Sequence, residues 1–137
     1  MIELLRIFAQ YDPAFCRIKE DKSSGLLFAE MLQVRPFDDD RWLTVATVYS
    51  DGTSFIWIEW GMTIREATER AIVAQGWIFG LQHYSDFVAH VARPKGIHYW
   101  GHADNSAEAM LGAYVKALEA GVSGDSPSTK LRMRSEE

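Results

Sequence analysis

The chain has 137 residues, 47% of them hydrophobic and 24% charged, and its formal net charge is −5. This composition is typical of one domain with its own hydrophobic core, and its acidity excludes a general nucleic-acid-binding protein, which needs a basic surface. Cys16 is the sole cysteine, so an internal disulfide is excluded and a cytoplasmic location is expected. No apolar run approaches the length of about 18 residues that a membrane-spanning helix needs, and we expect no membrane partner.

The N-terminal part of the chain predicts one short element followed by two strands. Ile2–Tyr11 fits helical spacing, although a strand stays open, and Asp12-Pro13 ends this element. Phe15–Lys19 alternates as a strand does. We interpret Leu26–Val34 as a second strand rather than a short helix, because a polar turn precedes it and Pro36 follows it.

The strongest local signal is a β-hairpin at Asp51-Gly52, between strands expected at Trp42–Tyr49 and Ser54–Trp60. An Asp-Gly pair favours this turn because glycine adopts positive φ without strain. With the two preceding strands, the hairpin completes a meander of about four strands. Apolar side chains alternate onto both faces of the hairpin, with Phe55 and Ile56 on opposite sides. We therefore expect a cover for each face, either helices or another chain.

Two helices have recognisable ends. Thr63-Ile64-Arg65-Glu66 has the pattern of a capping box, and Gly76 is expected to follow the end of the first helix. Asn105-Ser106-Ala107-Glu108 repeats the pattern at the start of a second helix, and we expect Gly121 to end it.

The segment between these helices is the least regular. We interpret Gly76–Gly80 as a helix end and a turn. Two interpretations of Leu81–His102 stay open. One is a short helix at Ser85–Val91, and the other is a hairpin that pairs Phe87–Ala92 with Ile97–Trp100.

Together these elements predict an α+β fold. Residues 1–121 are expected to form a single domain, in which an antiparallel sheet of about four strands packs with two to four helices. Residues 122–137 have too little apolar content to form a core, and we expect a polar, flexible C-terminal tail.

All four histidines fall in one segment: His83, His90, His98 and His102. The first two are seven residues apart and the last two are four apart, and such spacings would align metal ligands on a helix. However, Gly101 lies inside the second pair and no HExxH motif occurs. We therefore favour ordinary histidines and predict no metal or other cofactor, with a metal site at these four residues as the alternative.

No motif in the chain defines a catalytic centre. Ser85, Asp86 and His90 are residue types found in hydrolases, but no strand–turn–helix elbow surrounds Ser85. Cys16 is expected on a half-buried strand, where a thiol is usually inert. We therefore predict no catalytic residues.

The chain has more large aromatic side chains than a small core requires, including five Trp and seven Phe. Trp and Tyr are frequent anchors of protein interfaces. The candidate partner-binding residues are Phe55, Trp57, Trp77, Tyr99 and Trp100. These observations predict a cytosolic, non-enzymatic protein-binding module. The alternative is a small enzyme or metal-binding protein centred on His83–His102, and a homodimer would also cover a two-sided apolar sheet.

Two resemblances bear on this prediction. A helix, a three-stranded meander and a second helix resemble the order of a double-stranded RNA-binding domain, but Thr63–Ala67 lacks the lysines that bind phosphates there, so we expect no direct nucleic-acid binding. The Asp51-Gly52 turn, Thr63-x-x-Glu66-Ala67 and Asn105-x-x-Glu108-Ala109 together resemble, in style and over Trp42–Gly121, small accessory proteins encoded by phages and prophages. That resemblance implies an inhibitor that binds and blocks a host protein complex.

Overall fold

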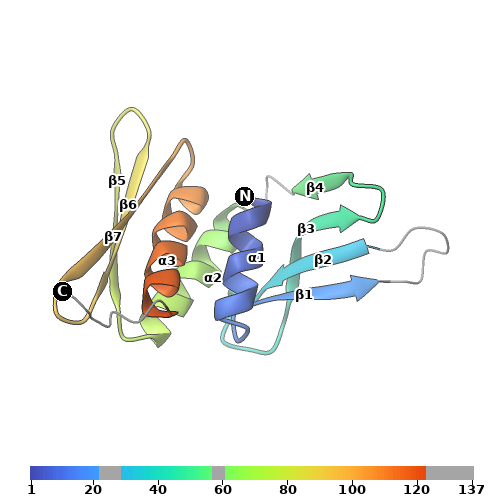
Figure 1. Cartoon of the computed structure of the whole chain (residues 1–137), viewed down its shortest axis with the longest axis horizontal. Coiled ribbons are helices and arrows are strands. Elements are labelled where there is room, and N and C mark those ends of the chain that lie inside the picture. The colour runs from blue at the N-terminus through green and yellow to red at the C-terminus, as the bar shows by residue number, and fades with distance from the viewer. Residues whose placement is uncertain (22–28, 57–60, 123–137) are drawn as a thin grey trace.

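Three helices form the middle layer of the molecule, and a β-sheet covers each side of that layer (Figure 1). The computed structural model describes residues 1–21, 29–56 and 61–122. Its helices are α1 (Ile2–Tyr11), α2 (Gly61–Ala74) and α3 (Ser106–Val122). Its strands are β1 (Cys16–Asp21), β2 (Ala29–Val34), β3 (Leu43–Tyr49), β4 (Ser54–Ile56), β5 (Ile78–His83), β6 (Phe87–Arg93) and β7 (Ile97–Ala103).

The fold is α+β, but the prediction of one sheet with about four strands is wrong. The described residues form a first sheet in the order β1-β2-β3-β4 and a second sheet in the order β5-β6-β7, both antiparallel. The first sheet is the expected meander. The second sheet confirms the hairpin interpretation of Leu81–His102, and β6 begins at Phe87, inside the alternative helix Ser85–Val91. Gly76–Gly80 is not simply a turn, because β5 already begins at Ile78.

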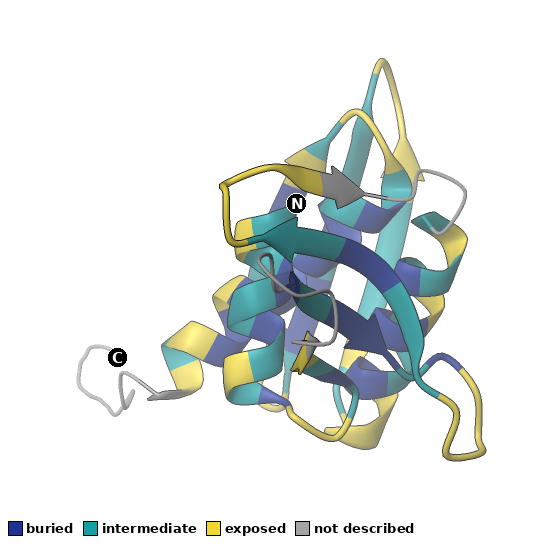
Figure 2. Ribbon diagram, turned by 90° about the vertical axis from the view of Figure 1, so that its right-hand side faces the viewer, coloured by how far each residue is buried: buried dark blue, intermediate teal, exposed yellow. Residues whose placement is uncertain are grey.

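A β-bulge in the first sheet changes which of its faces is apolar. Leu32 pairs with Ala46 but Gln33 pairs with Thr44, so Val45 is an extra residue in β3. As a result Val45 and Ala46, which are neighbours in sequence, are both fully buried. The predicted placing of Val45 and Ala46 on opposite faces of β3 is therefore wrong. Figure 2 looks onto this sheet from outside, and most of its strand residues are buried or half-buried while the connecting loops are exposed.

The expected turn and one of the two helix starts are confirmed. Gly52 has φ +93°, and the amide of Tyr49 donates to the carbonyl of Thr53 across the hairpin. The amide of Glu108 donates to Oδ1 of Asn105 at 2.8 Å, which caps α3. The start of α2 differs, because the helix begins at Gly61 and Thr63 lies inside its first turn.

Small residues bring α3 close to the second sheet. An added Cβ at Gly101 in β7 would lie 2.0 Å from the carbonyl oxygen of Ala109 and 2.6 Å from the amide nitrogen of Ala113. Both alanines are fully buried. Position 101 therefore accepts only glycine while this spacing is kept, and the helix backbone lies directly on the strand.

A buried network of hydrogen bonds connects α3 with the C-terminal ends of α1 and α2. The hydroxyl of Tyr114 in α3 donates to Oδ2 of Asp12, the residue that follows α1, at 2.5 Å, and Nε2 of Gln75 donates to the same hydroxyl at 3.3 Å. Burial raises the pKa of Asp12 above its usual 3.8, and the hydrogen bond from Tyr114 lowers it in part. Burial and the bond to Asp12 together raise the pKa of Tyr114, so the phenol is the donor.

Candidate functional site

The outward face of the second sheet is the best candidate for a functional surface. In each strand of this sheet alternate residues pack on the helices, among them Phe79, Val91 and Tyr99. The residues between them point away from the helices, because side chains alternate along a strand. We call these outward positions the histidine face: Ile78, Gly80, Gln82, Val88, His90, Ala92, His98, Trp100 and His102.

Two large apolar side chains are exposed on this face. Ile78 on β5 is 66% exposed and Trp100 on β7 is 52% exposed, so they lie on the two outer strands with β6 between them. None of the nine positions of the histidine face holds Asp, Glu, Lys or Arg. An exposed sheet face that lacks charged residues and carries aromatic side chains is unusual for a surface that meets only water.

The centre of the histidine face is a cluster of three rings. The centroids of His90 and Trp100 are 5.1 Å apart, those of His90 and His98 are 5.5 Å apart, and those of His98 and Trp100 are 6.4 Å apart. Gly80 leaves the room that the His90 ring fills, since a Cβ there would lie 2.4 Å from Cε1 and 2.9 Å from Nδ1. The nitrogen edge of His90 therefore faces β5, away from His98.

The other two predicted histidines have separate surroundings. His102 lies at one end of the histidine face, where its Nε2 is 2.9 Å from Oδ1 of Asp86. His83 pairs in register with Phe87 and stacks on its ring, with centroids 4.3 Å apart. Within the described part of the chain, no group of three or more His, Cys, Asp or Glu side chains could hold a metal ion. The four histidines are thus near in sequence but do not converge on one point.

Of the five predicted interface aromatics, only Trp100 is both described and exposed. Trp77 is half-buried, with its ring centroid 5.9 Å from that of Tyr114 and the Arg93 guanidinium 5.3 Å above it. Tyr99 is half-buried on the helix side of β7. Trp57 and the side chain of Phe55 lie outside the described residues. Sequence reasoning did not find Ile78 and Gly80 as residues of this face. Both lie in the run Ile-Phe-Gly-Leu, which forms part of β5, and Gly80 suggested a turn instead of a strand.

The residues considered for catalysis do not form a catalytic set. Asp86 pairs with His102, and Ser85 lies exposed in the turn between β5 and β6. The thiol of Cys16 is fully buried and donates to the carbonyl oxygen of Leu5 at 3.4 Å. Burial, with a further contribution from the negative charge of Asp12, raises the pKa of this thiol to about 12, so it is not a nucleophile at neutral pH.

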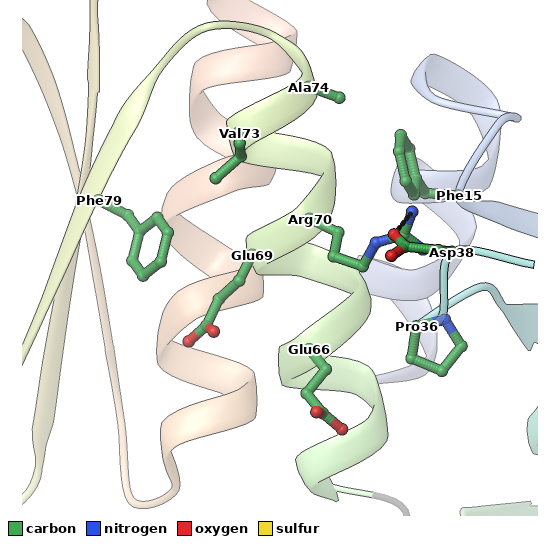
Figure 3. Close-up of a pocket in the computed structure, with 9 residues that line it drawn as sticks. All are labelled: Phe15, Pro36, Asp38, Glu66, Glu69, Arg70, Val73, Ala74 and Phe79. Carbon is green, nitrogen blue, oxygen red and sulfur yellow. Dashed lines mark ion pairs between the residues drawn. The ribbon is translucent and has the colours of Figure 1, made fainter.

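A separate, concave region lies beside α2, with a volume of about 540 Å³ (Figure 3). Phe15, Pro36, Val73 and Phe79 supply apolar walls, and Glu66 lies at its margin. Arg70 extends toward the loop after β2, where it pairs with Asp38 at 3.1 Å and donates to the carbonyls of Arg35 and Phe37. Arg70 is thus already engaged in fixing the loop, which favours a structural role for it.

Comparisons of the chain with protein-family models, with curated proteins and with solved structures give no significant match. Among the described residues, no helix is long and apolar enough to cross a bilayer. The surface chemistry of this fold is therefore what indicates a function.

Proposed function

We propose that this protein is a non-enzymatic protein-binding module and that the histidine face is its docking surface. The observation that carries the proposal is a sheet face that no described element covers, with a half-exposed Trp100, an exposed Ile78 and no Asp, Glu, Lys or Arg at its nine positions. Tryptophan is enriched among the residues that dominate binding energy, and charged residues are depleted at interface centres.

The same observations favour a protein over other classes of partner. A nucleic acid would place phosphates near the surface, and the histidine face offers no lysine or arginine to receive them. A small-molecule substrate is favoured by a deep pocket with convergent polar groups, whereas this face is a sheet surface with three neighbouring rings. A weakly polar sheet face fits another folded surface.

The inhibition of a host complex by a phage-encoded protein stays a prediction that derives from the sequence resemblance alone. The histidine face is compatible with this role because such an inhibitor needs one exposed binding surface. The same surface would be equally compatible with any other protein-binding role.

Site-specific photo-crosslinking in the cell tests the docking surface. A photoreactive aromatic residue replaces Ile78 in one variant and, as a matched control, Thr47 on the outward side of the first sheet in another. We expect covalent adducts of defined mass, including adducts with the chain itself, from position 78 and few or none from position 47. Equal labelling at both positions, or none at position 78, would overturn the proposal.

A further inference from the structure

We infer that a second copy of this chain binds the histidine face, which gives a two-fold symmetric dimer packed sheet against sheet. This inference rests on the proposed docking surface and names its partner. The first argument is electrostatic. The chain carries a net charge of −5, so two copies repel each other over most of their surfaces, but the nine positions of the histidine face carry no Asp, Glu, Lys or Arg.

The second argument is the distribution of large and small residues over the face. In the central row, Gly80 on β5, His90 on β6 and Trp100 on β7 are paired neighbours. In the adjacent row, Ile78, Ala92 and His98 are paired in the same way. Each row thus has a large exposed side chain on one outer strand and a smaller or more polar residue on the other.

A two-fold axis parallel to β6 matches these rows to themselves. Such an axis exchanges the outer strands, so that β5 of one copy lies over β7 of its partner. Trp100 then lies over the partner's Gly80 and the edge of its His90 ring, and Ile78 lies over the partner's His98. At the sheet-on-sheet spacing of about 10 Å, Trp100 therefore contacts the partner's His90 ring, which fills the room beside Gly80.

The size of the face sets the expected affinity. Three strands of six or seven residues measure about 14 Å by 20 Å, which corresponds to a small interface. An area of about 300 Å² on each copy is below the size of a standard interface, so we expect a weak, transient dimer with a dissociation constant of about 100 µM.

Sedimentation equilibrium of the full chain from about 1 to 500 µM tests this inference. Wild-type protein is expected to change from monomer to dimer within this range. Ile78→Lys alone and His98→Glu alone should each weaken the dimer at least about tenfold, because each places two uncompensated charges in the symmetric interface, one from each copy. The double variant Ile78→Lys, His98→Glu should recover most of the affinity, because the lysine of each copy then faces the glutamate of the other.

Thr47→Lys, on the outward side of the first sheet, is the matched control and should leave dimerisation unchanged. Each variant changes an exposed or half-exposed residue, and circular dichroism confirms its fold. A wild-type chain that stays monomeric, or a dimer that Ile78→Lys does not weaken, would overturn the inference. Failure of the double variant to recover would exclude this axis. Crosslinks from position 78 to a different protein, together with a monomeric chain, would overturn the dimer and leave the proposed function intact.

Discussion

The two sheets cover the same helical layer, but the aromatic side chains on their outward faces are covered to different extents. On the first sheet, Nε of Arg17 donates to Gln33 at 2.8 Å, and Gln33 in turn donates to Thr44 at 3.0 Å. The Arg17 guanidinium also lies 4.3 Å from the ring centroid of Trp42 and covers it. On the second sheet, Trp100 has no such cover and is half-exposed.

On the first sheet, side chains of the same chain cover the outward tryptophan, whereas on the second sheet no described side chain covers it to the same extent. On the outward face of the first sheet, a guanidinium covers the Trp42 indole, and the polar side chains Arg17, Gln33 and Thr44 are hydrogen-bonded to one another. On the outward face of the second sheet, the described ring contacts of Trp100 are with the imidazole side chains of His90 and His98 and not with a guanidinium. The comparison explains why the second sheet, rather than the first, is proposed to bind a partner.

The largest effect is expected where the second sheet meets the helices. Gly101→Ala places a methyl group 2.0 Å from the carbonyl oxygen of Ala109, and since the neighbouring atoms are backbone, β7 and α3 must separate. We expect a loss of about 3 kcal/mol in the free energy of unfolding, measured by urea denaturation.

The control for this test is Gly112→Ala in α3, where the nearest atom to an added Cβ is the Cα of Gly101 at 3.9 Å. Alanine should fit there and stabilise the helix by about 0.5–1 kcal/mol. Equal effects of the two substitutions would contradict the close approach of β7 to α3.

The second prediction concerns the buried hydrogen bond from Tyr114 to Asp12, which connects α3 with the end of α1. Because the pKa of Asp12 is raised on folding, the folded state holds its proton more tightly than the unfolded state does. The contribution of Asp12 to stability is therefore fully present below about pH 3.8 and is lost as the pH rises from there through the folded pKa.

Asp12→Asn keeps an acceptor for the hydroxyl of Tyr114 and removes the titration. The free energy of unfolding of the variant, relative to that of the wild type, should increase as the pH is raised from 4 to 7. A difference that is constant across this range would show that the Asp12 carboxyl is not held in a desolvated site.

The smallest effect on stability is expected on the outward face of the first sheet. Arg17→Ala should cost about 0.5–1 kcal/mol, because the nearer of the two cations over Trp42 and one half-exposed hydrogen bond are lost, while Arg35 stays 5.8 Å from the ring centroid. Thermal unfolding measures this cost. Sedimentation should show in addition whether the more exposed Trp42 makes the first sheet self-associate, which would strengthen the comparison between the two faces.

Local signals predicted the parts of the fold that depend on neighbouring residues. The Asp51-Gly52 turn and the Asn105 cap are set by backbone geometry within four residues, and both were found as expected. The same local reasoning failed at Gly80, because a glycine that suggests a turn lies inside β5, where it makes room for His90 from the next strand. That packing is a contact between strands and leaves no mark in the local sequence.

The candidate site could be predicted only in part. Trp100 and the histidines were visible as residue types, but their common face depends on the pairing of β5, β6 and β7. The bulge at Val45 shows the opposite case, in which a strand with an apparently two-sided apolar pattern turns its apolar residues to one side. Side-chain alternation therefore predicts a face only after the register is known.

The position of α3 in the chain has a consequence for synthesis. This helix packs on α1, α2, β6 and β7, and its Tyr114 bonds to Asp12, 102 residues earlier. Since a ribosome makes α3 after both sheets, the growing chain exposes the helix-facing side of the second sheet until α3 has emerged. We therefore expect the chain to gain its native fold only after release of α3 from the exit tunnel, and expression levels to depend on protection by chaperones during that interval.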